Sequence, residues 1–296
     1  MQRRVFLQTL LTIPLAGAVM KLKELNDMIS SLDSTALMPV LFIGHGSPMN
    51  AIEDTGFSRG WTAIGKQMPR PEVILCISAH WETKGTFVTA MEKPETIHDF
   101  GGFPQELFNV RYPAPGSPAT AKEVKRIIRK TEVGMDEKWG LDHGCWSVVR
   151  RMYPAADIPV IQLSLDFTQP AAYHYDLAKE LAPLRKKGVL IIGSGNMVHN
   201  LRRIDWSKTA YTPYGYDWAI EASEKMKKFI LSGDHQSLIN YRSQGSAFDM
   251  AIPTPEHYLP LLYALALKVE QDTVGIFNDQ SVMGSLTMTS LTIQKS

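Results

Sequence analysis

Four of the eight histidines in this chain stand in short segments rich in glycine, serine, asparagine or proline, which are typical of loops. They are His45 in Gly-His-Gly-Ser-Pro, His80 in Ser-Ala-His-Trp, His199 in Gly-Asn-Met-Val-His-Asn and His257 in Pro-Thr-Pro-Glu-His-Tyr. Two of them follow apolar runs, and open α/β sheets place their chemistry at the ends of strands. Because imidazole is a common ligand of divalent transition metals, this recurrence indicates a metal centre.

The remaining histidines carry weaker signals. A single histidine is more often an ordinary core or surface residue than a ligand, so each needs its context. His143 in Asp-His-Gly is a further candidate, as is His98 in a long irregular segment, whereas His174 and His235 lie in polar helical stretches and receive no role. His257 follows two prolines at the start of an apolar helix, and a buried imidazole needs a polar partner or a metal.

The elements that must position these side chains alternate between strand-like and helix-like segments. This alternation predicts a single α/β domain with a central, mostly parallel or mixed sheet, helices on both faces and the metal cleft at the C-terminal ends of the strands. Apolar or alternating runs predict strands at 40–43, 73–78, 86–91, 158–165, 189–192, 273–277 and 285–293. Helices are expected at 61–68, 118–130, 170–187, 216–231 and 256–267.

A long irregular segment, residues 93–118, separates two of these elements. Loops of this length in a compact domain are usually functional or disordered, and its aromatic content argues against disorder. We expect it to cover the cleft. Phe100, Phe103 and Tyr112 are candidates either for stacking on an aromatic ligand or for packing that fixes the loop, and Trp81 is a candidate wall of the same pocket.

Composition excludes several classes of protein. The 296 residues carry 31 basic and 30 acidic side chains, a formal charge of +1, so nothing favours a nucleic acid or an anionic surface as partner. Two cysteines, Cys76 and Cys145, form no disulfide framework, and no Cys-x-x-Cys pair offers a thiolate zinc site. The sequence does not reveal the oligomeric state.

The N-terminus is treated separately from the domain. Residues 1–20 combine Arg3-Arg4, an apolar run and small residues, which resembles a twin-arginine signal that exports folded proteins to the periplasm. The alternative is an amphipathic helix or anchor on a cytoplasmic protein. The run is shorter than the roughly 20 apolar residues that span a bilayer, so no stable membrane span is expected. Residues 21–37 are assigned as a linker or short helix, and 38–296 as the catalytic domain.

Seven strings in this order resemble the class III extradiol ring-cleavage dioxygenases, in particular the DOPA 4,5-extradiol dioxygenase branch. The resemblance runs from about Met38 to near the C-terminus. The strings are Gly-His-Gly-Ser-Pro-Met, Ser-Ala-His-Trp, His-Asp-Phe-Gly-Gly-Phe-Pro, Tyr-Pro-Ala-Pro-Gly-Ser-Pro, Asp-His-Gly-x-Trp, Gly-Asn-x-Val-His-Asn and Pro-Thr-Pro-Glu-His-Tyr-Leu-Pro.

The resemblance implies a mononuclear divalent metal that takes a catechol and O2 as substrates, with 4,5-cleavage of L-DOPA or a related ring. It implies His45, His80 and His257 as ligands, His199 as ligand or catalytic base, and His143 as a second candidate base. His98, Phe100, Phe103 and Trp81 are the expected substrate contacts.

This branch departs from its distant relatives at one ligand. Those relatives use two histidines and a carboxylate, the facial triad suited to Fe(II). In this chain the position of that carboxylate is taken by His257, with Glu256 adjacent. An all-histidine set also binds Zn(II) well, so iron is the expected active metal and zinc a plausible bound one.

Two other classes of function fit the same histidines. A zinc-dependent hydrolase acting on an amide or ester would use a metal-activated water, and a non-catalytic binding relative would keep the fold without turnover. Dependence on dioxygen separates the first from a dioxygenase. A phosphate-binding loop at Gly193-Ser194-Gly195-Asn196 is excluded because the third glycine and the lysine are absent. A nucleophile elbow at Ser47 is excluded because no glycine stands two positions later.

Overall fold

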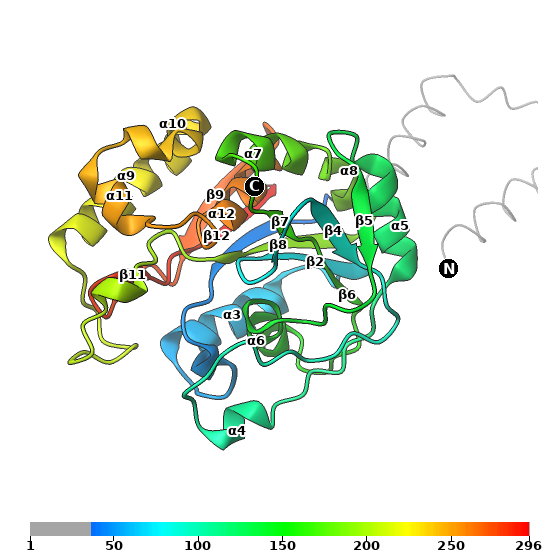
Figure 1. Cartoon of the computed structure of the whole chain (residues 1–296), viewed down its shortest axis with the longest axis horizontal. Helices are drawn as coiled ribbons and strands as arrows, with labels where there is room; N and C mark the ends of the chain where they lie inside the picture. The colour runs from blue at the N-terminus through cyan, green and yellow to red at the C-terminus, as the bar shows by residue number, and fades with distance from the viewer. Residues whose placement is uncertain (1–36, 296) are drawn as a thin grey trace, which may run out of the picture. The chain divides into compact units, whose positions relative to one another are not determined.

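A six-stranded mixed sheet forms the centre of the domain in this computed structural model, which describes residues 37–295 (Figure 1). Its order is β6-β2-β8-β1-β12-β9, in which β6, β2, β8 and β1 run parallel and β12 runs antiparallel to both its neighbours. The strands are β1 Val40–Gly44, β2 Val73–Ser78, β6 Val160–Gln162, β8 Val189–Gly195, β9 Asp272–Phe277 and β12 Ser290–Lys295.

Three two-stranded pairs surround the central sheet. They are β3–β7, β4–β5 and β10–β11. Their bounds are β3 Glu82–Thr83, β4 Thr86–Thr89, β5 Val133–Asp136, β7 Leu165–Asp166, β10 Ser281–Val282 and β11 Leu286–Thr287.

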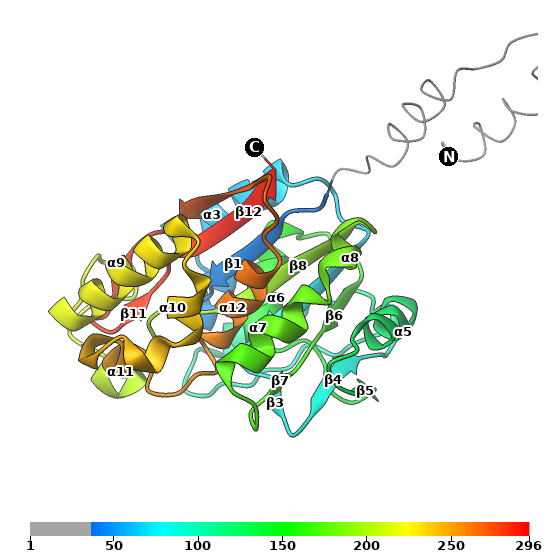
Figure 2. The same cartoon turned by 90° about the horizontal axis from the view of Figure 1, so that it is seen from above.

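Helices cover both faces of the central sheet, as predicted (Figures 1 and 2). On one face α12 packs against β8 and β1 with α7 beside it, and on the other α6 lies against β2 with α3 beside it. The helices are α3 Gly56–Gln67, α4 Gln105–Phe108, α5 Pro118–Ile127, α6 His143–Met152, α7 Ala171–Lys179, α8 Ala182–Arg185, α9 Asp217–Ser232, α10 His235–Ile239, α11 Ser246–Ala251 and α12 Leu259–Ala266. Three short 3-10 helices are η1 Pro48–Ala51, η2 Leu201–Arg203 and η3 Tyr241–Ser243.

The continuous apolar runs of the parallel strands are explained by these two covered faces, because successive side chains of a strand point to opposite sides. In β1, Val40 and Phe42 join the core cluster that contains α12, whereas Leu41 and Ile43 join the one that contains Trp61 of α3. All four are fully buried. The same alternation holds along β2 and β8, so one strand sequence serves two cores.

Several element boundaries differ from the sequence expectations for local reasons. The helix predicted at 170–187 is two helices, because Pro183 has no N–H to donate to the carbonyl of Lys179, the last residue of α7. The strand predicted at 158–165 is divided into β6 and β7, since Ser164 leaves the central sheet and its backbone N–H donates to Phe87. The α6 helix was not predicted.

A serine cap and a proline define the start of α5. Ser117 Oγ accepts a hydrogen bond from the N–H of Thr120 at 3.3 Å, and Pro118 occupies the first helical position. The helix ends at Ile127, three residues before the predicted end. Within residues 37–295, no helix is long and apolar enough to cross a membrane. The segment predicted as a signal, residues 1–20, and residues 21–36 lie outside the described residues.

Candidate metal centre

The candidate centre lies where three adjacent parallel strands end. The strand order β2-β8-β1 places these ends side by side, so the loops that follow them meet at one edge of the sheet. His45 directly follows β1, and His80 comes two residues after β2. Backbone hydrogen bonds tie the loops together: His45 N–H donates to Gly195 O at 3.1 Å, and Ala79 N–H to Ser194 O at 3.0 Å.

His257 reaches the same edge from the loop before α12. Its carbonyl accepts a hydrogen bond from Asn196 N–H at 2.8 Å, directly after β8. Gly195 makes this approach possible, because a Cβ at this position would overlap the carbonyl oxygen of His257. The glycines at the end of β8 therefore serve close packing and not phosphate binding.

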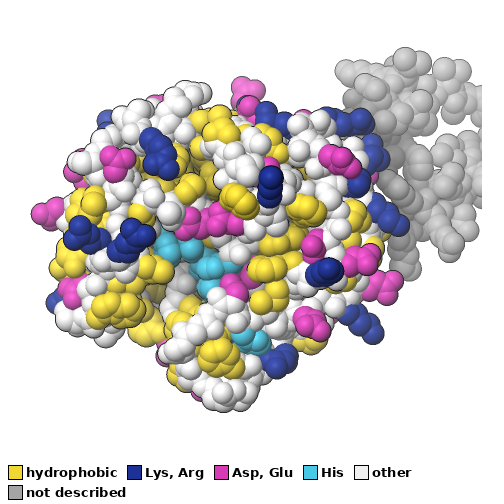
Figure 3. All heavy atoms as spheres, viewed as in Figure 1, with side chains coloured by type: hydrophobic (Ala, Val, Ile, Leu, Met, Phe, Trp, Pro, Cys, Tyr) yellow, Lys and Arg dark blue, Asp and Glu magenta, His cyan; other side chains and the backbone are white. Residues whose placement is uncertain are grey.

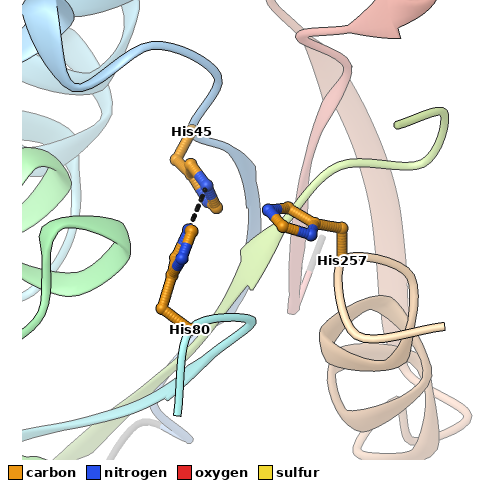
Figure 4. Close-up of side chains that lie close together, drawn as sticks. All are labelled: His45, His80 and His257. Atoms are coloured by element: carbon orange, nitrogen blue, oxygen red, sulfur yellow. Dashed lines mark hydrogen bonds between the residues drawn. The ribbon is translucent and has the colours of Figure 1, made fainter. Parts of the chain in front are cut away.

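The imidazoles of His45, His80 and His257 converge although they come from three different loops (Figure 4). The Nε2 atoms of His45 and His80 lie 3.1 Å apart. One nitrogen from each of the three rings falls within 4.8 Å of the others. His45 and His257 are 2% and 7% exposed, so the group is held in the interior and not on the surface.

The hydrogen bonds of these rings fix their tautomers. Ser194 Oγ donates to Gly144 O at 2.6 Å, so toward His45 Nδ1, 3.1 Å away, it acts as acceptor and that nitrogen carries the proton. His257 Nδ1 faces Glu256 Oε1 at 3.2 Å. With Nδ1 protonated in both rings, each Nε2 keeps a free lone pair.

His80 follows the same pattern, with Nδ1 3.4 Å from Asp99 Oδ2. Oxygen acceptors behind ligating imidazoles are typical of metal sites, where they orient the ring and raise its basicity. Two Nε2 lone pairs at 3.1 Å repel each other unless a cation lies between them. The donor set therefore fits one divalent metal ion.

The pKa values of these imidazoles are shifted toward the neutral form. Burial, strengthened by the neighbouring imidazole of His80, lowers the pKa of His45 well below 6.5. Burial and the ring of His199 do the same to the pKa of His257. Burial, with a further contribution from His143, lowers the pKa of His80 to about 3 against the opposing effect of Asp99. Neutral imidazole is the form that binds metals.

Two further histidines flank the three. His143, the first residue of α6, has its Nδ1 3.0 Å from Asp99 Oδ2, and its backbone N–H donates to Asp99 Oδ1 at 2.8 Å. The ring of His199 stacks on that of His257 with centroids 3.5 Å apart. Burial lowers the pKa of His199 to about 4, although Glu256 opposes it.

A cavity of about 590 Å³ opens over the histidines. Figure 3 shows histidine side chains in a hollow on this face, with hydrophobic side chains around it. Most of the remaining lining is apolar. The lining residues are His45, Gly46, Ser47, Pro48, Met49, Asn50, His80, Asp99, Phe100, Phe103, His143, His199, Leu201, Ile204, Trp206, Ala210, Tyr211, His257, Val282, Met283, Leu286 and Met288.

The comparisons with known proteins agree with this site. Residues 39–290 match the family model described as the catalytic LigB subunit of aromatic ring-opening dioxygenase. This chain belongs to that family. It is 47% identical to the 4,5-DOPA dioxygenase extradiol of Escherichia coli K12 over 264 residues, which are 88% of this chain and 96% of the relative. It is 35% identical to the Beta vulgaris protein of the same name over 244 residues, 80% and 90% of the two chains.

A solved structure shows the same fold. The crystal structure of an uncharacterized protein from Escherichia coli K12 matches with a TM-score of 0.75 and 42% identity, covering 86% of this chain and 99% of that one. The chain is therefore a class III extradiol dioxygenase of the DOPA branch, as the sequence strings indicated.

Two of the four expected substrate contacts lie in the cavity of this dioxygenase. Phe100 and Phe103 line it, with ring centroids 5.4 Å apart. Tyr112, the residue for which stacking and packing were both open, is buried and donates its hydroxyl proton to Tyr153 O at 2.9 Å. It packs the long loop against the domain.

Trp81 and His98 stand outside the lining, and this placement corrects their expected contact with a ligand. Trp81 is buried and stacks on Trp139 at a centroid distance of 5.8 Å, because the chain turns into β3 directly after His80. His98 faces the Val110 carbonyl at 3.1 Å and so fixes the long loop from within.

Sequence reasoning missed the oxygen atoms behind the histidines. Asp99, Ser194 and Glu256 are the acceptors that orient the rings of the candidate ligands. Asp99 stands within a string that resembled the family and Ser194 directly precedes another, but nothing in the local pattern assigns them partners 44 and 149 residues away. Glu256 was noted only as the residue adjacent to His257.

Proposed function

We propose that this dioxygenase opens a substituted catechol at a bond beside the diol, with 4,5-cleavage of L-DOPA as the reference reaction. The observation that carries the proposal is the convergence of one ring nitrogen from each of three histidines below an apolar cavity with two phenylalanines in its lining. The names of the Escherichia coli and Beta vulgaris relatives support DOPA as the reference substrate.

The metal is assigned to His45, His80 and His257. Fe(II) is the proposed active ion, and Zn(II) would fit the same nitrogen donors. When bound, the metal supplies the sites at which the catechol oxygens and O2 are held together and acidifies the diol.

His199 is the proposed base for a catechol proton. Both it and His143 line the cavity, but the Nδ1 of His143 is already engaged by Asp99. Among residues 37–295, no hydrogen bond occupies either ring nitrogen of His199, so it has a lone pair available to accept a proton. His143 donates its Nδ1 proton to Asp99, so its Nε2 keeps a lone pair and His143 stays the second candidate base, in an orientation fixed by that carboxylate.

The apolar lining has a chemical role of its own. Phe100, Phe103 and Met288 exclude water from the reacting atoms and hold the aromatic ring by stacking and contact. Fixing both substrates in one dry cavity removes much of the entropic cost of their meeting.

The direct test is anaerobic reconstitution of the full chain with Fe(II), followed by L-DOPA and then O2. Ring opening, seen as a yellow product, should begin only when O2 is added. Activity without O2 on an amide or ester would instead support the zinc hydrolase alternative. His45→Ala should lose metal binding and turnover, and a fully active variant would contradict the ligand assignment.

We also propose that residues 1–20 direct export to the periplasm. The support is the Arg3-Arg4 pair followed by an apolar run and small residues. Expression of the full chain, fractionation and N-terminal sequencing of the mature protein test this. Recovery only from the cytoplasm with Met1 intact would overturn the proposal.

A further inference from the structure

The cavity is larger than a catechol ring requires. At about 590 Å³ it lies in the range of sites that bury whole drug-sized ligands. His45 and His257 are buried and so form its base, whereas Leu201, Trp206 and Tyr211 are 59%, 79% and 40% exposed and so form its mouth. A substrate bound at the base extends its substituent toward these three side chains.

Hydrogen bonds fix the segment that forms the mouth of the cavity. Residues 201–212 run beside the β10–β11 hairpin, where Asp205 N–H donates to Met283 O at 2.9 Å and Asn200 N–H to Ser285 O at 3.1 Å. Gln280 Nε2 donates to Tyr211 O at 3.1 Å. Trp206 thus stands between positions that are anchored on both sides, at 205 and 211.

The backbone of Met283, in this hairpin, also indicates that the mouth is held in a fixed conformation. It lines the cavity with a backbone φ of +51°, in the left-handed region that side chains other than glycine rarely adopt. Holding such a residue in this conformation costs on the order of 1–2 kcal/mol. A strained residue in a cavity wall points to a functional constraint on its position.

No lysine or arginine among residues 37–295 lines this cavity. The three cations of the neighbouring loop are directed elsewhere. Arg202 and Arg203 line a separate recess with Tyr216 and Trp218, and Lys208 Nζ lies 5.1 Å from the ring centre of Tyr214.

The acidic side chain in the lining, Asp99, already interacts with two histidines. Asp99 has His143 Nδ1 at 3.0 Å and His80 Nδ1 at 3.4 Å from its Oδ2. A substituent that carries a carboxylate or an ammonium group would therefore enter an apolar mouth without a partner, at the cost of its hydration.

We propose that this dioxygenase prefers catechols with an uncharged apolar substituent, and that Trp206 is the residue that selects them. The inference rests on the proposed catechol cleavage and refines its substrate class. The indole covers the substituent at the mouth and supplies a large apolar contact area. L-DOPA, whose tail carries both charges, is a slower substrate of the same site.

Four catechols of similar length but different charge test the preference. They are 4-propylcatechol, 3-(3,4-dihydroxyphenyl)propanoate, dopamine and L-DOPA, assayed with the Fe(II)-reconstituted full chain. We expect kcat/KM for 4-propylcatechol to exceed that of each charged compound by about tenfold or more, since an unpaired charge is poorly tolerated in an apolar site. If a charged compound has a kcat/KM equal to or above that of 4-propylcatechol, the substituent preference is overturned but the proposed catechol cleavage is not. If no catechol is turned over, the proposed function itself is overturned.

Variants of Trp206 test the assigned residue. In Trp206→Ala, the kcat/KM ratio of 4-benzylcatechol to 4-methylcatechol should fall about tenfold, and Trp206→Phe should restore most of it, because an aromatic ring supplies the contact. Leu231→Ala removes a comparably exposed apolar side chain, 62% exposed, from α9 outside the cavity and should leave the ratio unchanged.

A binding measurement provides a second readout. Under anaerobic conditions 4-benzylcatechol should quench tryptophan fluorescence, and the quenching should be much reduced in Trp206→Phe while that variant still turns the compound over. An unchanged ratio in Trp206→Ala, or undiminished quenching in Trp206→Phe, would overturn the assignment of Trp206.

Discussion

Ser194 Oγ lies 3.1 Å from His45 Nδ1 while donating its own proton to the carbonyl of Gly144. One hydroxyl at the end of β8 therefore joins the end of β1 to the start of α6 and decides which nitrogen of His45 is free. The chemistry of the centre depends on such oxygen atoms as much as on the rings, since an imidazole without a fixed tautomer presents the wrong nitrogen for part of the time.

Replacing this hydroxyl should weaken metal binding. In Ser194→Ala we expect the affinity for Zn(II) or Fe(II) to fall about 10–100-fold, the usual effect of removing an oxygen that orients a ligand. Competition with a chelator measures it. Ser147→Ala is the matched control, because Ser147 Oγ in α6 is buried without a hydrogen-bond partner in the described chain and its loss should leave affinity unchanged. Equal affinities in all three proteins would contradict the tautomer argument.

Asp99→Asn should reduce turnover more than metal binding. The amide oxygen can still accept from the backbone N–H of His143, but the amide group cannot hold both ring nitrogens of His143 and His80 as a carboxylate does. We expect kcat to fall about 10–100-fold, within the range for groups that orient an active-site histidine. Metal content, measured on the same sample, should change less.

The control for this variant is Asp54→Asn. Asp54 forms an exposed pair with Arg59 and is not part of the cavity lining, and exposed pairs contribute little. If Asp99→Asn kept the kcat of the unaltered enzyme, His143 would have no role that depends on its carboxylate partner.

Gly195→Ala should destabilise the fold and displace His257. The added methyl group would overlap the His257 carbonyl, a backbone atom that cannot move without shifting the ligand. Overpacking of this kind typically costs about 1–3 kcal/mol in free energy of unfolding, which urea denaturation measures. Gly56→Ala at the start of α3 is the control, because a Cβ there meets no atom within 4 Å. A Gly195→Ala protein as stable and as metal-bound as the unaltered one would refute the close approach.

The sequence predicted the positions of the histidine ligands better than it predicted the groups around them. His45 and His80 could be placed because a buried parallel strand is a continuous apolar run, and the residue after it must lie at the active edge of the sheet. His257 is preceded by no such strand: its loop context and expected burial suggested a polar partner or a metal, and the family resemblance made it a specific ligand. The local pattern predicted that His257 lies at the start of a helix, but it did not identify the group that hydrogen-bonds its ring.

The partners of the histidines and the walls of the cavity depend on tertiary contacts that no local sequence pattern encodes. Asp99 is 44 residues from His143, and its role follows from how the long loop folds back over α6. Trp81 illustrates the opposite case: adjacency to a candidate ligand predicted a pocket wall, but the chain turns at residues 79–80 and the Trp81 ring stacks on Trp139. The cavity mouth brings residues 201–211 beside 282–288, and the sequence gives no sign that these two segments are neighbours.

His174, which received no role from the sequence, should contribute to the pH dependence of stability. It is fully buried in α7 beside the Tyr263 hydroxyl of α12, and burial lowers its pKa from 6.5 to about 4. The unfolded chain therefore binds a proton at this residue below pH 6.5 that the folded chain does not bind until about pH 4. Its contribution is fully present above pH 6.5 and is lost as the pH falls from 6.5 to 4, by about 3 kcal/mol.

The measurement is the free energy of unfolding in urea at several pH values for the metal-free protein and for His174→Gln. The cluster of His45, His80, His199 and His257 titrates in the same direction, so the difference between the two proteins isolates His174. Gln has no group that titrates in this window, and its variant should lose less stability between pH 6.5 and 4 than the unaltered protein. Parallel curves for the two proteins would show that His174 is protonated equally in the folded and unfolded states.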